Sequence, residues 1–260
     1  MKLRLAVHKF ASCDGCQLGL LDAGPDLLRL AGQVEIVHFA EAGILDPEAQ
    51  ADIALVEGSI TTAADRARIQ AIRRRSRLLV ALGACAGSGG IQALRNDAGG
   101  AWLRDVYPHP DWLEAEPDSL PLSALVKVDQ VLPGCPVSTG QLLALLRDLI
   151  LGVVPRDEED SLCLECKRRG QVCVMVARGE PCLGPVTHAG CGAVCPGQGR
   201  GCYGCSGPAA QGEPAHLARY WTAQGEAPGR VARRFRLIHS QAPALRAVVE
   251  GLQAGEDEHD

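Results

Sequence analysis

The positions of the cysteines constrain this chain more than any other feature of its sequence. The 260 residues include twelve cysteines, which is the number of thiolates that three four-iron clusters need with none left over. Four are spread over residues 13–135, and eight are crowded into residues 163–205. The twelve are Cys13, Cys16, Cys85 and Cys135, followed by Cys163, Cys166, Cys173, Cys182, Cys191, Cys195, Cys202 and Cys205.

Two other uses of cysteine compete with cluster binding. Disulfide frameworks belong mainly to short secreted chains that cannot build a core, whereas this chain is long enough to build one. Its first residues, MKLRLAV, lack the features of a secretory signal, so we expect a reducing, cytoplasmic location. Zinc is the second alternative for the eight clustered cysteines, because paired Cys-x-x-Cys units also build structural zinc sites.

Composition excludes two classes of partner. The formal net charge of -5 argues against a nucleic-acid surface. No stretch reaches the roughly 18 apolar residues of a membrane span. The longest candidate, 142–154, is interrupted by Arg147 and Asp148, so we expect no direct membrane insertion.

Strand and helix signals alternate through the first 150 residues. Apolar strands that alternate with amphipathic helices indicate a parallel sheet covered on both faces. We therefore predict an α/β, flavodoxin-like open sheet in a domain spanning residues 1–154. The expected strands are 3–10, 34–39, 52–56, 78–82 and 126–132, and the expected helices are 17–30, 62–74 and 138–151.

The first four cysteines follow three of these strands. Ligands of such folds gather at the carboxyl ends of the strands, so Cys13, Cys16, Cys85 and Cys135 are predicted to converge at one edge of the sheet. The glycine-rich segment 83–90 lacks the endings of a Walker loop and of a dinucleotide fingerprint. We interpret it as a loop whose backbone N–H groups point at cluster sulfides.

A second, irregular domain is predicted for residues 155–260. It follows the acidic, proline-containing segment 152–160, and its part from 161 to 208 has little periodicity, which suggests folding around metal rather than around an apolar core. Helices are expected over 217–221 and 230–252. Arg233, Arg234 and Arg236 are interpreted as a solvated or partner-facing stripe rather than an anion site, and 255–260 as a frayed tail.

Several motifs resemble the small subunit of nickel–iron hydrogenases. The C-terminal cysteine pattern is most similar to the delta subunit of the cytoplasmic, bidirectional sulfhydrogenase or NADP-linked branch. The motifs are Cys13-Asp14-Gly15-Cys16, Glu57-Gly58-Ser59-Ile60, Gly83-Ala84-Cys85-Ala86, Gly134-Cys135-Pro136, the run from Pro181 to Thr187, and Ala189-Gly190-Cys191.

The resemblance implies three 4Fe-4S clusters that relay single electrons. It assigns the proximal cluster to Cys13, Cys16, Cys85 and Cys135, the medial cluster to Cys191, Cys195, Cys202 and Cys205, and the distal cluster to Cys163, Cys166, Cys173 and Cys182. The Ni-Fe centre is expected in a separate large subunit, and FAD and NAD(P) in iron–sulfur and flavin diaphorase subunits. The chain alone is not expected to oxidise hydrogen.

Two alternatives remain within this resemblance. One is the small subunit of a viologen- or heterodisulfide-reductase-linked [NiFe] hydrogenase. The other is a quinone-module subunit similar to that of complex I, which normally carries adjacent tandem cysteines. This sequence has no Cys-Cys pair.

Two further residues have competing interpretations. Glu57 either accepts backbone N–H bonds at a turn or, as the resemblance implies, lies near the large subunit on a proton route. His188, close to Cys191, is either a surface histidine or a hydrogen-bond donor that tunes a cluster.

Overall fold

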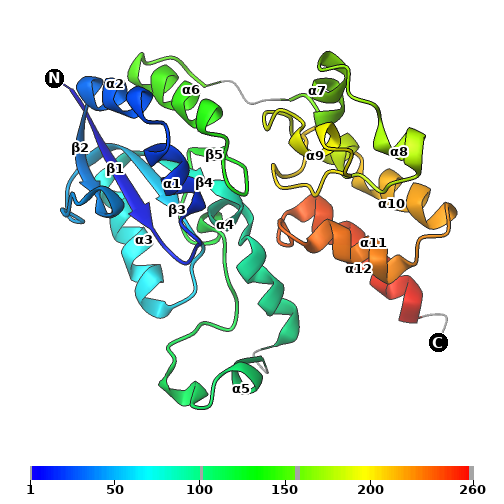
Figure 1. The fold of residues 1–260 in the computed structure, drawn as a ribbon. Helices are drawn as coiled ribbons and strands as arrows, with labels where there is room; N and C mark the ends of the chain where they lie inside the picture. The colour runs from blue at the N-terminus through cyan, green and yellow to red at the C-terminus, as the bar shows by residue number, and fades with distance from the viewer. Residues whose placement is uncertain (1, 100–101, 156–158, 258–260) are drawn as a thin grey trace. The chain divides into compact units, whose positions relative to one another are not determined.

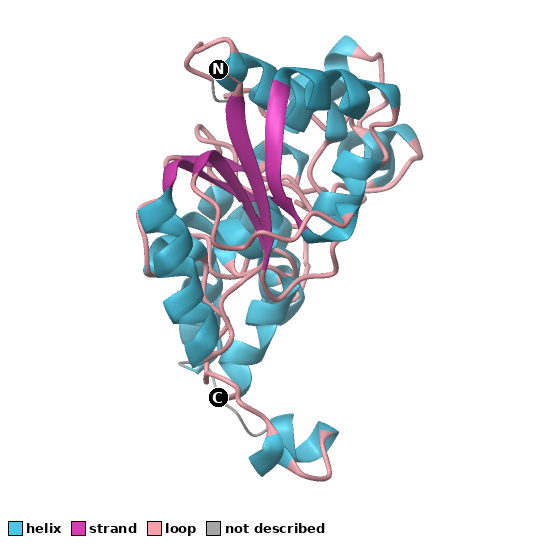
Figure 2. Cartoon of the chain, turned by 90° about the vertical axis from the view of Figure 1, so that its left-hand side faces the viewer, coloured by secondary structure: helices cyan, strands magenta, loops and turns pink. Residues whose placement is uncertain are grey.

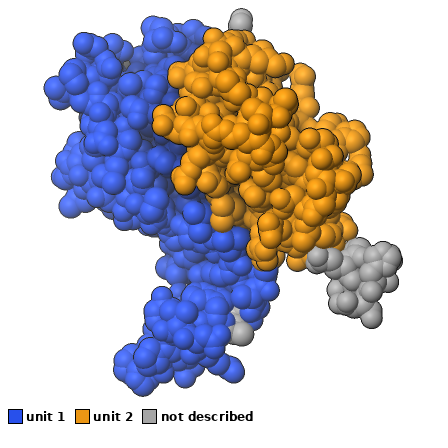
Figure 3. Space-filling view, turned by 45° about the vertical axis from the view of Figure 1, so that its right-hand side comes forward, with its two compact units in different colours: residues 1–155 blue, residues 156–260 orange. Residues whose placement is uncertain are grey.

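A computed structural model describes residues 2–99, 102–155 and 159–257. The chain divides into two compact units, Met1–Pro155 and Arg156–Asp260, which are considered separately below (Figures 1 and 3).

The first unit is built on a five-stranded sheet in which every neighbouring pair is parallel. The strand order β2-β1-β3-β4-β5 is the order found in flavodoxin-like folds. The predicted parallel sheet is therefore confirmed. The strands are β1 (Leu3–Lys9), β2 (Val34–Phe39), β3 (Ala51–Glu57), β4 (Ser76–Leu82) and β5 (Gln130–Leu132).

Helices cover both faces of this sheet (Figure 2). Side chains alternate along β3, so Ile53 and Leu55 pack with the apolar side chains of α1, α2 and α6. Ala54 and Val56 face the other way, toward α3, α4 and η4. The helices and turns of this unit are α1 (Gly15–Leu21), α2 (Pro25–Gln33), η1 (Ala40–Ala42), α3 (Ala63–Arg75), α4 (Gly83–Ser88), η2 (Ile91–Ala98), α5 (Trp102–Val106), η3 (Pro110–Trp112), η4 (Leu122–Ala124) and α6 (Thr139–Ile150).

The sequence-based prediction was wrong at three places in this unit. The single helix expected over 17–30 is two helices, because the chain turns at Gly24 and Pro25 begins α2. The last strand covers only Gln130–Leu132 of the expected 126–132. The glycine-rich segment 83–90 begins with the helix α4 rather than forming a loop.

Two histidines are buried side by side on neighbouring strands. The rings of His8 on β1 and His38 on β2 are 4.7 Å apart between centroids. Burial, the neighbouring His38 and the guanidinium groups of Arg68 and Arg75 lower the pKa of His8 from 6.5 to about 3. Burial and Arg68 also lower the pKa of His38, although Asp46 opposes this shift. Both rings are therefore neutral in the folded protein near neutral pH.

This pair makes the stability of the first unit depend on pH. The unfolded chain binds a proton at His8 below about pH 6.5 while the folded chain does not, so stability is lost as pH falls through that value. From His8 alone, the free energy of unfolding is expected to be about 2 kcal/mol lower at about pH 5 than at about pH 7. Native-state hydrogen exchange of the β1 amides, corrected for intrinsic rates, measures the difference. His8→Phe should flatten the dependence, and an equal slope in this variant would contradict the explanation.

The second unit has an apolar core of its own. The cysteine-rich segment was expected to fold around metal rather than an apolar core, but Leu162, Leu183 and Val186 are buried in one cluster with Trp221 and Phe235. The C-terminal helices supply the apolar faces that the segment itself lacks. The elements of this unit are α7 (Leu162–Arg168), α8 (Val174–Arg178), η5 (Gly184–Val186), α9 (Val194–Gly197), α10 (Pro214–Ala223), α11 (Pro228–Arg236) and α12 (Pro243–Asp257).

The C-terminal helices differ from the prediction in their boundaries. The helix expected over 230–252 is interrupted between α11 and α12, where Pro243 begins the last helix. Residues 255–257 of the expected frayed tail belong to α12, and 258–260 lie outside the described residues. Within the described ranges, no helix has both the length and the apolar character needed to cross a bilayer.

Candidate metal centres

Four thiols of the first unit are brought together at the carboxyl end of the sheet. Cys13 and Cys16 follow β1, Cys85 lies in α4 directly after β4, and Cys135 follows β5. A Cβ added at Gly83 would lie 2.5 Å from the Cys16 sulfur and 3.2 Å from the Gly134 carbonyl oxygen, so these segments are in contact.

The remaining links between these segments are equally short. The Ala84 N–H donates to the Gly134 carbonyl oxygen at 2.7 Å and joins the loop after β5 to α4. A Cβ added at Gly15 would lie 3.4 Å both from the Cys13 sulfur and from Cβ of Pro136. The backbone amide of Ala84 is thus used within the protein, so it is not one of the N–H groups that could point at a cluster sulfide.

Glu57 holds the beginning of α1 in place. It ends β3, the strand between β1 and β4, and it is 1% exposed. Its carboxylate accepts the N–H groups of Cys16 and Gln17 at 3.2 and 3.1 Å. The first interpretation of Glu57, as an acceptor of backbone N–H bonds, is therefore what the contacts show. These bonds satisfy two of the free amides at a helix start.

The buried thiols of this group resist ionisation in the absence of metal. Burial is the largest cause that raises the pKa of Cys16, and the charge of Glu57 adds to it. Burial also raises the pKa of Cys85, and the nearby Cys13 contributes in the same direction. Because metal ligation requires thiolates, loading this site must release protons.

The eight thiols of the second unit lie near one another, and their electrostatic contacts also cross the predicted grouping, between Cys166 and Cys191 and between Cys195 and Cys182. Burial raises the pKa of Cys163 to about 11, and the next causes are the charges of Cys182, Cys166 and Cys173. A Cβ added at Gly184 would lie 3.3 Å from the Cys182 sulfur and 3.7 Å from the Cys163 sulfur. Cys163 therefore lies near the other three cysteines of the predicted distal set.

Cys205 lies near the other three cysteines of the predicted medial set. Burial raises the pKa of Cys205, and the charges of Cys191 and Cys195 add to the effect. Burial raises the pKa of Cys202 to about 12, with Cys182 and Cys205 as weaker contributors. Cys202 thus lies between the two groups, beside a cysteine of the predicted distal set.

Backbone N–H groups point at the buried sulfur atoms of this unit. The Cys182 sulfur accepts from Cys202 at 3.1 Å and from Gly184 at 3.4 Å, and the Cys202 sulfur accepts from Gly204 at 3.3 Å. Such bonds stabilise the thiolate form that metal ligation requires, and around iron–sulfur clusters they tune the reduction potential.

Glu165, which the sequence interpretation missed, connects the two groups. It lies between Cys163 and Cys166 on α7. Its carboxylate accepts the N–H groups of Gly190, Gly192 and Ala193 at 3.2, 2.9 and 3.2 Å. One side chain thereby anchors the turn that carries Cys191 to the helix that carries the first two cysteines of the other group.

Removing this anchor is expected to destabilise the second unit. In Glu165→Ala three backbone donors lose their acceptor, and we expect a loss of about 2 kcal/mol in the free energy of unfolding. Protection of the Gly192 amide from hydrogen exchange should fall at the same time. Glu180→Ala removes an exposed carboxylate of the same unit and should change neither quantity. Equal effects of both substitutions would show that Glu165 is not an anchor.

The sequence pointed to His188, but the histidine that is hydrogen bonded to the backbone of a cysteine is His239. His239, 4% exposed, is hydrogen bonded through Nε2 to the Cys205 carbonyl oxygen at 2.9 Å. Burial lowers its pKa, and His188 also contributes in that direction. His188 is half-buried, and its backbone N–H donates to the Gly207 carbonyl oxygen at 3.0 Å.

No local motif marks His239. It lies between α11 and α12, 34 residues beyond Cys205, the last cysteine of the chain. Only the packing of the C-terminal helices against the cysteine segment brings its ring to the Cys205 backbone.

The geometry bears on the two alternatives to cluster binding. None of the twelve cysteines, all of which are described, forms a disulfide. Among the described residues, no three His, Cys, Asp or Glu side chains are grouped closely enough to hold one metal ion. A tetrahedral zinc site uses four such ligands around one ion. Metal content is therefore the observation that distinguishes zinc from iron at these thiols.

Comparison with known proteins identifies the family. Residues 13–149 match the family described as NADH ubiquinone oxidoreductase, 20 Kd subunit. The chain is 36% identical over 206 residues to the sulfhydrogenase 2 subunit delta of Pyrococcus furiosus, an alignment that covers 79% of this chain and 86% of the relative. It is 29% identical to a subunit of the vhu F420-non-reducing hydrogenase of Methanococcus voltae, covering 86% of this chain and 90% of the relative.

Solved structures agree with this relationship. A chain of an NAD+-reducing [NiFe]-hydrogenase aligns with a TM-score of 0.55 and 31% identity, covering 60% of this chain and 96% of that one. An actinobacterial-type NiFe-hydrogenase from Ralstonia eutropha H16 shares the fold, with a TM-score of 0.56, 17% identity, and coverage of 98% of this chain and 91% of that one. The chain therefore belongs to the family of the NADH ubiquinone oxidoreductase 20 kDa subunit, and within it to the hydrogenase small or delta subunits.

Proposed function

We propose that this chain is the electron-transfer subunit of a nickel–iron hydrogenase and holds three 4Fe-4S clusters. The observation that carries the proposal is that four free thiols follow strands of one parallel sheet at its carboxyl end, while the other eight lie near one another in the second unit. The proximal ligands are Cys13, Cys16, Cys85 and Cys135, the medial ligands Cys191, Cys195, Cys202 and Cys205, and the distal ligands Cys163, Cys166, Cys173 and Cys182.

The residues around the thiols fit this role. When bound, such clusters accept and release one electron at a time. The chain supplies sulfur ligands, and in the second unit it directs backbone N–H groups at Cys182 and Cys202. Carboxylates at Glu57 and Glu165 fix the backbone that carries the cysteines. The role of Glu57 on a proton route to the large subunit is a further part of the proposal.

The proposed partners follow from the relatives. A large subunit would carry the Ni-Fe site, and iron–sulfur and flavin diaphorase subunits would carry FAD and reduce NAD(P) in the cytoplasm. The delta subunit of the sulfhydrogenase, 36% identical over 79% of this chain, supports a place in a hydrogenase. The 31% identical chain of the NAD+-reducing [NiFe]-hydrogenase supports the nicotinamide-reducing partner. The chain of the NAD+-reducing enzyme matches only 60% of this chain although 96% of that chain is aligned. About two fifths of this chain therefore has no counterpart there.

A second candidate function is favoured by the fraction of this chain that each relative matches. The subunit of the vhu F420-non-reducing hydrogenase matches 86% of this chain, more than the sulfhydrogenase relative does. Linkage to a viologen- or heterodisulfide-reductase-type acceptor is therefore the alternative to a nicotinamide acceptor. Subunits that co-purify with the chain distinguish the two, because only the first predicts a flavin subunit that reduces NAD(P).

Metal analysis of anaerobically purified protein tests the proposal directly. We expect about twelve irons and an equal amount of acid-labile sulfide per chain, with broad absorption near about 400 nm. In Cys195→Ser, loss of one ligand should leave the chain folded and produce a three-iron signal in the oxidised electron paramagnetic resonance spectrum. An unchanged spectrum would reassign Cys195, whereas protein that contains zinc and no iron would refute the function itself.

A further inference from the structure

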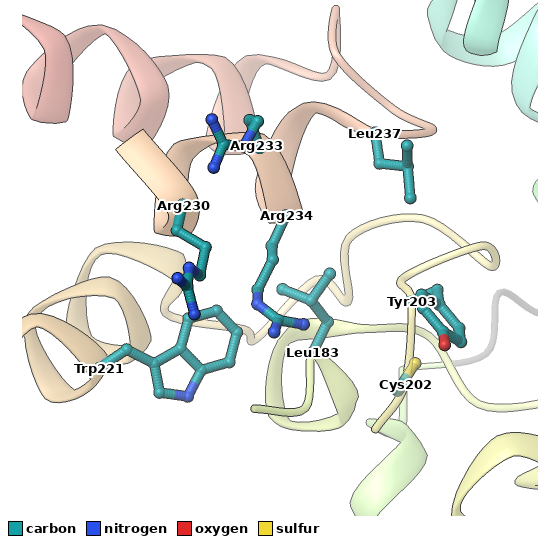
Figure 4. A pocket seen from close by; sticks show the side chains of 8 residues that line it. All are labelled: Leu183, Cys202, Tyr203, Trp221, Arg230, Arg233, Arg234 and Leu237. Carbon is teal, nitrogen blue, oxygen red and sulfur yellow. The ribbon is translucent and has the colours of Figure 1, made fainter. Parts of the chain in front are cut away.

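A cavity in the second unit is lined by arginines on one side and apolar side chains on the other. Its volume is about 250 Å³. Figure 4 shows the side chains of Arg230 and Arg234 extending from α11 toward Trp221 and Leu183. The lining residues are Leu183, Cys202, Tyr203, Trp221, Arg230, Arg233, Arg234 and Leu237.

The positive charge of this cavity is poorly balanced within the chain. Arg230 pairs with Glu226, but at 3.7 Å between Nε and Oε2. Among the described residues, no acidic side chain forms an ion pair with Arg233 or Arg234. Arginines three and four positions apart on a helix repel one another, so the arrangement costs stability unless an anion is bound.

The unbalanced positive charge is clearest at Arg234. Its side chain is half-buried, and its Nε is fully buried without a hydrogen-bond partner. The helix dipole favours arginines in the last turn of a helix, but this effect is weak and is screened by salt. It accounts for an exposed arginine such as Arg233, whereas a half-buried guanidinium with a buried, unsatisfied N–H costs stability until an acceptor reaches it, and an anion is the strongest acceptor.

The dimensions and chemistry of the cavity indicate the class of ligand. Guanidinium groups pair best with the oxygens of carboxylate and phosphate. A phosphate carries about -1.5 to -2 charges at neutral pH, which matches the two guanidinium groups that extend into the cavity, Arg230 and Arg234, better than one carboxylate does. The cavity is smaller than the roughly 300–1,000 Å³ of sites for drug-sized molecules. Only a compact ligand fits.

We propose that this cavity binds a phosphate dianion, either inorganic phosphate or the phosphate group of a small ester whose apolar part contacts Trp221 and Leu183. Cys202 forms part of the same wall, so a bound dianion would lower the reduction potential of a cluster ligated by Cys202. This second consequence rests on the proposed function, whereas the binding itself does not.

Calorimetric titration of the full chain, purified anaerobically, tests the binding. The probes are inorganic phosphate and phenyl phosphate, which distinguish free phosphate from an ester with an apolar part. Arg230→Gln and Arg234→Gln should each weaken binding by about tenfold, which is about 1.4 kcal/mol. Arg236→Gln removes the same charge from the same helix outside the cavity lining and should leave the affinity unchanged.

The outcomes distinguish a specific phosphate site from a nonspecific attraction of anions to the arginines of α11. Absence of binding for both probes, or equal weakening by Arg236→Gln, would overturn the proposal. Arg230 is exposed, so its variant remains informative even if Arg234→Gln does not fold. In chain that contains clusters, phosphate should also lower the potential of one cluster in a redox titration followed by electron paramagnetic resonance. A chain without iron would refute the proposed function, and the binding measurement would still decide this site.

Discussion

Replacing Gly83 by alanine is expected to remove the proximal site while the two sites of the second unit stay loaded. The backbone φ of Gly83 is +78°, which costs an alanine about 1–2 kcal/mol. Its Cβ would also lie 2.5 Å from the Cys16 sulfur, in a buried place where neither group can move freely. Iron should fall from about twelve to about eight atoms per chain.

Gly32→Ala is the matched control for this prediction. Gly32 lies in α2, and a Cβ there would meet nothing within 4 Å. Iron content should stay unchanged, and stability should rise by at most about 1 kcal/mol, because alanine is favoured over glycine in helices. A full complement of iron in Gly83→Ala would show that the proximal ligands are not arranged as proposed.

Replacing Gly201 by alanine is expected to have a larger effect, because it separates two segments that both carry cysteines. A Cβ at Gly201 would overlap the Pro181 carbonyl oxygen and lie 3.3 Å from Cα of Cys182. The segments are joined there by Leu183 N–H to the Cys202 carbonyl oxygen at 3.1 Å and by Cys202 N–H to the Cys182 sulfur at 3.1 Å. Separation breaks both bonds and displaces one cysteine of each group.

The expected result is loss of both sites of the second unit. Iron should fall to about four atoms per chain, all held by the first unit. Gly251→Ala is the control, because Gly251 is exposed in α12 with nothing within 4 Å of an added Cβ. Iron analysis of the two variants gives the comparison. Retention of the second-unit signals in Gly201→Ala would contradict the close approach on which the prediction depends.

The fold of the first unit could be predicted well from the sequence, and the second unit less so. Apolar runs such as that of β3 are local signals, and parallel strands place their carboxyl ends at one edge, so the convergence of Cys13, Cys85 and Cys135 follows from chain order. The apolar core of the second unit could not be predicted in this way. Its members come from the cysteine segment and from three later helices, and no local periodicity joins them.

The order of residues along the chain establishes the number of thiols, their spacing and the strands that carry four of them. Packing in three dimensions selects the other side chains that act on these thiols. Glu57 reaches amides 40 and 41 residues away, and Glu165 reaches amides 25 to 28 residues away. The cavity beside α11 likewise requires that Arg234 and Trp221, on different helices, line one space. Such contacts join distant segments, and spacing along the chain does not encode them.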